Sequence, residues 1–338
     1  MKLALKILAG LLGALLVVLI SLAIYVYATA LKPETPVGFQ QVAIADPGHH
    51  PLAAAIWYPT SAKPGFALLG LMGERVATDA AVAGDHLPLV VISHGTGATS
   101  FSHADTALAL AQNGFVVIAP MHTGDNFQDD SDVGKPDWLL NRSRHVERAI
   151  DMALKSWKDR AHIDPNRIGV FGFSAGATTA LINIGATPDL RRIASQCAQR
   201  PEFVCKITSP ALYRNVKPQP WHSDTRIRAA VIAAPGLGFT FPPAGLSAVH
   251  VPVQLWQGTD DQTVPFATNA ELIERYLPHP PEVHLVPGAT HYSFLAPCGL
   301  IGPPQLCRDG KGFDRRAFHT AFNDAVVKFF QTQLNSSL

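Results

Sequence analysis

The stretch Ile168-Gly169-Val170-Phe171-Gly172-Phe173-Ser174-Ala175-Gly176 decides the fold of this chain. It begins with an apolar run that predicts a buried strand, and residues 177–182 read as the first turns of a helix. A Gly-x-Ser-x-Gly sequence at a strand-to-helix junction is typical of a nucleophile elbow, a sharp turn that lifts the serine hydroxyl above a sheet. The same five-residue pattern also occurs in ordinary glycine-rich turns. Its context here favours Ser174 as a nucleophile.

Strand and helix patterns alternate on both sides of this motif. Apolar runs predict strands at residues 89–92, 115–119, 168–171, 229–233, 251–256 and 283–286. Helical spacing of apolar residues predicts helices at 104–112, 138–157, 267–277 and 313–334. Residues 37–45 and 52–58 predict an antiparallel hairpin at one edge of the sheet, and residues 61–86 show no clear period. Such alternation predicts an α/β fold, a mostly parallel sheet with helices on both faces.

Composition and patterning indicate one large exported domain, residues 33–338, behind an N-terminal segment, residues 1–32. The chain has 338 residues, of which 47% are hydrophobic and 16% charged, and this suffices for a large core. Residues 189–223 break the strand–helix rhythm and contain several prolines, which predicts a small cap-like insertion over the site. A net charge of +1 without a basic stripe argues against a nucleic-acid partner.

The N-terminal segment predicts membrane targeting. Lys2 and Lys6 precede an uncharged, mostly apolar run at residues 7–31, long enough to span a bilayer. Positive charge before the run places the N-terminus in the cytoplasm and the domain outside. An uncleaved anchor is favoured because the run is longer than a usual signal-peptide core. A signal peptide cleaved at the small residues 28–30 remains the alternative. Both interpretations export the domain, to the periplasm or the extracellular side, anchored or secreted.

Four cysteines form two pairs that are close in the sequence, and both pairs lie in loop-like segments with prolines. Local pairing is the simplest of the three possible connectivities, and an oxidising compartment permits it. The predicted disulfides are Cys197–Cys205 and Cys298–Cys307. The alternative is four unrelated buried thiols. No Cys-x-x-Cys spacing is present, so we predict no metal site.

Residues that would activate Ser174 follow it in the required order. A serine hydroxyl needs a base to take its proton, and a carboxylate to orient that base. In hydrolases that carry an elbow, the acid and then the histidine follow in loops after later strands. Residues 257–265 follow one predicted strand and contain two aspartates, whereas His291 follows the last predicted strand after a Gly-containing turn. The order predicts a catalytic triad.

The acid of this triad is either of two adjacent aspartates. Asp261 lies three residues after Gly258 and four before Pro265, the usual spacing for the acid in such loops. Asp260 fits a turn position better. We therefore predict Asp261 as the acid.

An oxyanion hole requires a second backbone donor from a loop after an earlier strand. The first predicted donor is the amide of Ala175, at the start of the helix. The loop after residues 89–92 contains His94 and Gly95 and supplies the second, the amide of Thr96. His94 either braces this loop or acts as a second base, and bracing is favoured. His122, after another strand, either lines the pocket or has a structural role.

The chain resembles α/β-hydrolases, and among them a bacterial group labelled predicted dienelactone hydrolases, which are similar to platelet-activating-factor acetylhydrolases. The resemblance covers roughly residues 37–334. It rests on five segments: 90–97, 172–176, 258–265, 288–298 and 312–315. It implies the α/β-hydrolase fold and ester hydrolysis through an acyl-enzyme, with no cofactor.

One departure from that group concerns the nucleophile. Dienelactone hydrolases use a cysteine at the elbow, whereas this chain has Ser174, so an ordinary small-molecule or lipid ester is the expected substrate. An acyltransferase, a lipase or a peptidase with the same triad is the alternative within enzymes. A non-catalytic, membrane-tethered binding protein is the alternative outside them, and its expected signature is a missing triad residue.

Overall fold

The computed structural model describes residues 2–70, 72–299 and 302–335. Within them, ten strands form a single mixed sheet in the order β10-β9-β8-β7-β5-β6-β2-β1-β4-β3. The strands are β1 (Val37–Ile44), β2 (Leu52–Pro59), β3 (Gly65–Leu69), β4 (Met72–Thr78), β5 (Leu87–Ser93), β6 (Val116–Pro120), β7 (Ile163–Phe173), β8 (Ile227–Ala233), β9 (Val253–Gly258) and β10 (Glu282–Val286). The helices are α1 (Lys2–Ala28), α2 (Ala104–Gln112), α3 (Trp138–Asp151), α4 (Ala175–Asn183), α5 (Arg192–Gln199), α6 (Val204–Ile207), α7 (Pro243–Leu246), α8 (Ala270–Tyr276), α9 (Pro304–Cys307) and α10 (Arg315–Asn335).

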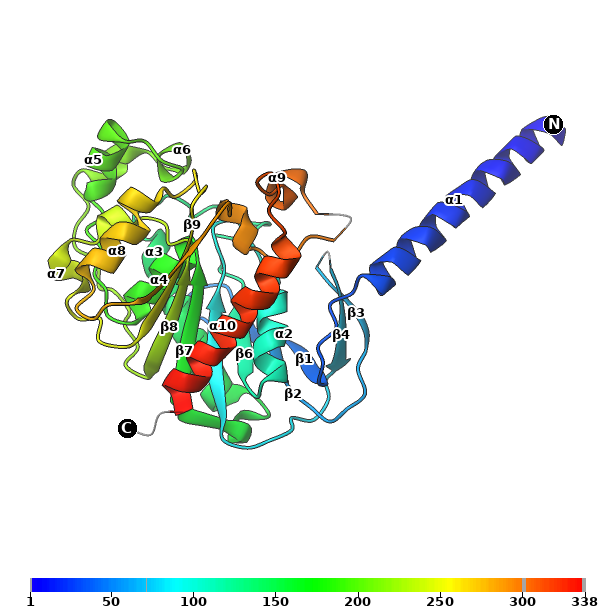
Figure 1. Cartoon of the computed structure of the whole chain (residues 1–338), viewed down its shortest axis with the longest axis horizontal. Coiled ribbons are helices and arrows are strands. Elements are labelled where there is room, and N and C mark those ends of the chain that lie inside the picture. The colour runs from blue at the N-terminus through cyan, green and yellow to red at the C-terminus, as the bar shows by residue number, and fades with distance from the viewer. Residues whose placement is uncertain (1, 71, 300–301, 336–338) are drawn as a thin grey trace.

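The strands from β5 to β10 run parallel to one another, as the alternating pattern predicts. Helices cover both faces of this part of the sheet (Figure 1). Helices α3, α4 and α8 pack on one face, and α2 and α10 pack on the other. Side chains of β5 illustrate the two layers, because Leu89 and Val91 enter one core and Val90 and Ile92 enter the other. The predicted α/β fold is therefore present.

The predicted edge hairpin forms, but it does not lie at the edge. Strands β1 and β2 pair antiparallel over their whole length. A second hairpin of β3 and β4 then extends the sheet beyond β1. It lies in residues 61–86, where the sequence shows no clear period and predicts no particular element. The helix predicted at residues 138–157 is also shorter than expected, since α3 stops at Asp151 and a π-helical turn continues to Ser156.

The inner face of the second hairpin holds a buried carboxyl. Glu74 on β4 is fully buried, and its Oε2 accepts a hydrogen bond of 3.0 Å from Trp57 Nε1. Burial raises the pKa of Glu74 to about 8, which favours the neutral carboxylic acid. The hairpin is therefore held to the sheet by its inner face.

Helix α1 projects away from the domain (Figure 1). It is the one described helix that is long and apolar enough to cross a membrane, and none of its residues is buried. After α1 ends, Leu31 pairs with β4, because its amide donates to Gly73 and its carbonyl accepts from Arg75, both at 2.8 Å. The helix is thus joined directly to the sheet by a strand-like contact.

The cap-like region contains α5, α6 and a short 3₁₀ turn, Pro210–Tyr213. The hydroxyl of Tyr213 donates to the carbonyl of Gly134 at 2.8 Å, and Asn269 Nδ2 donates to Glu202 Oε2 at 2.9 Å. A disulfide between Cys197 and Cys205 closes the region on itself. A second disulfide joins the other two cysteines, Cys298 and Cys307, so both pairs are the local ones that the sequence favoured.

Candidate active site

Ser174 lies at the sharp turn between β7 and α4, with φ 56° and ψ −119°. This backbone conformation is strained for a residue with a side chain. Glycines on both sides make the turn possible. A Cβ on Gly172 would lie 2.1 Å from the carbonyl oxygen of Gly176, and a Cβ on Gly176 would lie 1.9 Å from that of Ser93. The motif therefore folds as the elbow that its sequence context predicts.

The three residues predicted as a triad meet at this turn. His291 Nε2 lies 3.0 Å from Ser174 Oγ, and His291 Nδ1 lies 2.7 Å from Asp261 Oδ2. The imidazole and the carboxylate are buried, whereas the serine is partly exposed. Because a carboxylate only accepts, Nδ1 carries the proton toward Asp261 and Nε2 faces the serine hydroxyl as an acceptor. This is the arrangement that a general base for Ser174 requires.

Backbone donors fix the orientation of the Asp261 carboxylate. Its Oδ1 accepts from the amides of Thr263 and Val264, at 2.8 and 2.9 Å. The other oxygen is left for His291, with Gln257 Nε2 at 3.3 Å as a further donor. The neighbouring Asp260 is exposed and bonds the hydroxyl of Thr259 at 3.0 Å. Asp261 is thus the aspartate that contacts the histidine.

The two amides predicted as oxyanion donors come from separate segments, the start of α4 and the loop after β5. Ala175 is the first residue of α4, where an amide has no partner within the helix. Among the hydrogen bonds of the described residues, the amides of Ala175 and Thr96 have no acceptor in the chain. A Cβ on Gly95 would lie 3.3 Å from Ser174 Cβ and 2.9 Å from the ring of Phe173, so glycine lets the Thr96 loop approach the elbow closely. Both amides are available to a ligand oxygen.

A buried ion pair holds the loop that contains Thr96. Asp125 Oδ1 accepts from the amide of Gly97 at 2.7 Å, and its Oδ2 accepts from Arg142 and from Trp138 Nε1. Burial alone would raise the pKa of Asp125, but Arg142 and the Gly97 amide lower it below its usual value. Arg142 also donates to the carbonyl of His94. Helix α3 therefore holds this loop at two points, directly at the His94 carbonyl and through Asp125 at the Gly97 amide.

His94 contributes to the same loop as a neutral side chain. Its Nδ1 donates to the carbonyl of Gly95 at 2.7 Å, so its Nε2 accepts from the backbone amide of His122 at 3.1 Å. Burial lowers the pKa of His94 to about 4. His122 is completely buried and bonds the hydroxyl of Ser93 at 2.9 Å. The structure therefore places both histidines against the loop that contains Thr96, and neither is hydrogen-bonded to Ser174.

These contacts predict the effect of His94→Ala. The change removes the contact that holds the Gly95 carbonyl and displaces the Thr96 amide, but it leaves the triad in place. We expect kcat to fall by about 10²–10³, the cost of one lost oxyanion donor, with little change in KM. His94→Asn, whose amide can still donate to the Gly95 carbonyl, should recover part of the rate. A loss of about 10⁶ on an ester substrate, the size for a missing triad residue, would instead make His94 a base.

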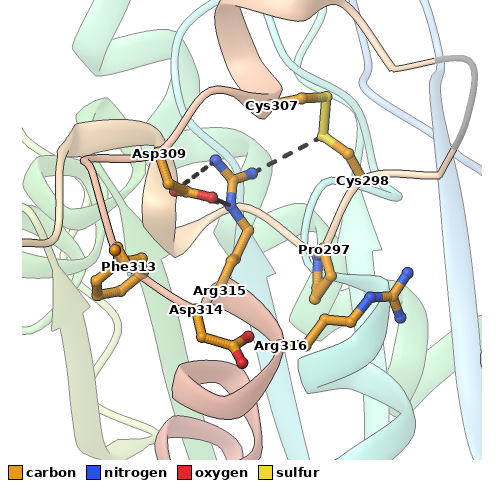
Figure 2. Close-up of a pocket in the computed structure, with 9 residues that line it drawn as sticks. Pro297, Cys298, Cys307, Asp309, Phe313, Asp314, Arg315 and Arg316 are labelled. Atoms are coloured by element: carbon orange, nitrogen blue, oxygen red, sulfur yellow. Dashed lines mark hydrogen bonds and ion pairs between the residues drawn. A yellow bond between two sulfur atoms is a disulfide. The ribbon is translucent and has the colours of Figure 1, made fainter.

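Further contacts brace the segment that carries His291. Ser293 Oγ donates to Asp309 Oδ1 at 2.8 Å, and Arg315 makes an ion pair of 2.9 Å with the same carboxylate. Figure 2 shows Arg315 and Asp309 facing each other beside the disulfide of Cys298 and Cys307. These four residues line a hollow of about 440 Å³. The disulfide and the ion pair therefore close the loop that follows the histidine.

A second buried pair holds the same segment from the opposite side. His319 on α10 bonds Asp105 Oδ2 through Nδ1 at 2.6 Å and the carbonyl of Ser293 through Nε2 at 2.9 Å. Burial alone would raise the pKa of Asp105, but His319 lowers it below its usual value. The position of His291 thus depends on α2 and α10, which lie on one face of the sheet.

Sequence reasoning missed these supporting residues. They are Asp105, Asp125, Arg142, Ser293, Asp309, Arg315 and His319. Each of them is a polar residue in a helix or a loop, and in the sequence such a residue looks the same as one exposed to solvent. The segment at 312–315 was noted for its resemblance to a family, and this was the one signal that pointed to Arg315.

A comparison of the whole fold finds the same architecture in a solved structure. The ferulic acid esterase from Streptomyces cinnamoneus superposes with a TM-score of 0.65 over 91% of this chain and 94% of that chain. The two sequences are 21% identical. This match shows that the chain has the α/β-hydrolase fold.

Sequence comparisons match parts of the chain. Residues 74–203 match the profile of the dienelactone hydrolase family, a range that includes Ser174 but neither Asp261 nor His291. Poly(3-hydroxyalkanoate) depolymerase C of Paucimonas lemoignei is 24% identical over 195 residues, which is 56% of this chain and 44% of that protein. Protein usf of Aquifex pyrophilus is 32% identical over 83 residues, 24% of this chain and 36% of that protein. The chain thus spans less than half the length of either relative.

Proposed function

From an α/β-hydrolase fold that resembles the dienelactone hydrolase family, we propose that this chain is a serine hydrolase that cleaves carboxylic esters. The observation that supports this most strongly is the pair of contacts that His291 makes, 3.0 Å to the hydroxyl of Ser174 and 2.7 Å to the carboxylate of Asp261. The names of two similar proteins, a depolymerase and a ferulic acid esterase, agree with hydrolysis. The serine at the elbow argues for an ordinary carboxylic ester.

The proposed reaction has two steps, in which His291 moves the proton each time. Ser174 Oγ attacks the ester carbonyl carbon while His291 Nε2 takes the hydroxyl proton, and Asp261 stabilises the imidazolium that forms. The amides of Thr96 and Ala175 donate to the carbonyl oxygen as it becomes negative. His291 then gives its proton to the alcohol that leaves. In the second step His291 takes a proton from water as the water oxygen attacks the acyl carbon. It then gives that proton to Ser174 Oγ as the bond between this oxygen and the acyl carbon breaks, which releases the acid and restores the serine.

We also propose that the domain is exported and held at a membrane by α1. The apolar length of α1 and the two disulfides support export. Retention of the helix is supported by its contacts with the domain, since the guanidinium of Arg75 lies 3.7 Å from the ring centre of Tyr27 on α1. A tethered hydrolase outside the cytoplasm is thus the form of the protein that we propose.

Turnover of p-nitrophenyl esters of increasing acyl length tests the proposed function. We expect the full chain in detergent micelles to release p-nitrophenol in a burst, as one acyl group accumulates on each serine, followed by a slower steady rate. Product analysis with an added alcohol distinguishes hydrolysis from acyl transfer. Absence of turnover with every ester, together with absence of a fluorophosphonate adduct, would rule the proposal out.

A further inference from the structure

The hairpin of β3 and β4 has an apolar outer face. Phe66 and Leu68 of β3 are 41% and 62% exposed, and they lie on one side of the strand because side chains alternate. Their partners across the hairpin are Arg75 and Gly73, which share this face. The opposite face carries Glu74, which is buried against Trp57. One face of the hairpin therefore packs on the sheet, and the other presents large apolar side chains outward.

The end of α1 lies against this outer face. The ring of Tyr27 is 5.6 Å from the ring of Phe66, and the guanidinium of Arg75 lies over Tyr27. A Cβ on Gly73 would lie 3.0 Å from the carbonyl oxygen of Val26, so the absence of a side chain lets the helix approach the strand. Figure 1 shows the hairpin beside the end of α1.

The direction of the chain shows which way the hairpin points. Leu31 pairs in parallel with Glu74, so the start of β4 and the turn of the hairpin point back along α1, toward its N-terminus. Leu68 is the register partner of Gly73, the residue that meets Val26. Leu68 therefore lies closer than Phe66 to the apolar middle of α1.

The aromatic residues of α1 give the depth of this face in a bilayer. Tyr25 and Tyr27 lie in the last turn of the helix, where tyrosines concentrate at a membrane–water interface. Phe66 contacts Tyr27, and Leu68 lies deeper. We propose that the β3–β4 hairpin enters the outer leaflet beside α1, as a second and shallow membrane contact. This inference rests on the retained anchor in the function proposed above.

A lipid surface fits this face better than a second copy of the chain. The face continues without a break into an apolar helix that itself needs lipid, and Arg75 is placed where a cation can reach lipid phosphates from an interfacial position. β3 is also an edge strand, and exposed apolar side chains on such a strand invite pairing unless something covers them. The head-group region covers the side chains and still solvates the free backbone edge.

The membrane contact would lie close to the oxyanion loop. A Cβ on Gly70, at the turn of the hairpin, would lie 3.3 Å from the ring of Phe101. Phe101 follows Thr96 by five residues in the same connection between β5 and α2. Entry of the hairpin into the leaflet therefore brings this connection toward the bilayer.

Depth-dependent quenching in nanodiscs tests the proposal. All four cysteines are in disulfides, so a single introduced cysteine can be labelled selectively with an environment-sensitive fluorophore. The full chain would carry Leu68→Cys or, as matched control, Leu285→Cys. Leu285 is 51% exposed on β10, the strand at the opposite edge of the sheet. Mass spectrometry of the purified chain first shows whether the residues before Leu31 are present.

We expect blue-shifted emission at position 68 and quenching there by lipids with a nitroxide near the head group, at the depth of about 5–10 Å typical of interfacial segments. Position 285 should give neither signal. Equal quenching at the two positions, self-association of the hairpins without lipid quenching, or a mature chain that begins at Leu31 would each overturn the proposal. The readout needs no turnover, so a failed proposal about the hairpin is distinguishable from a failed esterase assignment.

Discussion

Ser174→Ala is expected to lower kcat for a p-nitrophenyl ester by about 10⁶, the size of loss when the serine of a comparable triad is removed. The hydroxyl oxygen of Ser174 is the atom that attacks the ester carbonyl. His291, whose Nε2 lies 3.0 Å from this oxygen, cannot take its place as the group that accepts the acyl chain. KM should change little, because the backbone amides of Thr96 and Ala175 and the side chain of His291 stay in place. Labelling by a fluorophosphonate should disappear with the activity.

Stability should be almost unaffected by this change, since the Ser174 hydroxyl is hydrogen-bonded to His291 and to no other described side chain. The melting temperature of Ser174→Ala therefore checks that the lost rate is chemical. Ser247→Ala is the matched control, because Ser247 is an exposed serine just after α7 whose hydroxyl donates to the carbonyl of Ala244 in that helix. A variant without Ser174 that still reacted with the probe would show that another residue is the nucleophile.

The parts of the fold that were predicted from the sequence are those where one pattern determines the outcome. Buried parallel strands such as β5 and the second half of β7, residues 168–173, are continuous apolar runs, and a helix that packs on them repeats its apolar residues at helical spacing. The β3–β4 hairpin has no such pattern. Its outer face carries the apolar side chains of Phe66 and Leu68 although no core covers them, and its inner face buries the carboxyl of Glu74. The alternation of apolar and polar residues in this hairpin therefore does not indicate which face is buried.

The same physical reason limits what could be predicted of the site. Ser174, Asp261 and His291 could be predicted to meet because each follows a strand, and the ends of parallel strands lie at one edge of a sheet. Arg142 and His319 lie inside helices, where the sequence around them is that of a solvated face. Their roles arise from tertiary contacts, with Asp125 and the Ser293 carbonyl, that no local pattern encodes.

Asp261→Asn is expected to lower kcat by about 10⁴, because the change leaves the geometry intact and reverses the imidazole tautomer. The amides of Thr263 and Val264 donate to one oxygen of the carboxylate, at 2.8 and 2.9 Å. In asparagine that position must hold the amide oxygen, so the NH₂ group faces His291 Nδ1. The histidine then accepts at Nδ1 and carries its proton on Nε2, where it can no longer take the proton of Ser174.

Asp260→Asn is the control that the sequence itself provides. Asp260 is the adjacent aspartate and the other candidate for the acid, but its carboxylate is exposed and bonds Thr259. Its variant should keep kcat and KM for p-nitrophenyl esters within about twofold, as expected for a surface change away from the site. A large loss in Asp260→Asn with near-normal rates in Asp261→Asn would transfer the acid role to Asp260. Loss in Asp261→Asn alone means that a single hydrogen bond of 2.7 Å to Nδ1 determines whether His291 can act as a base.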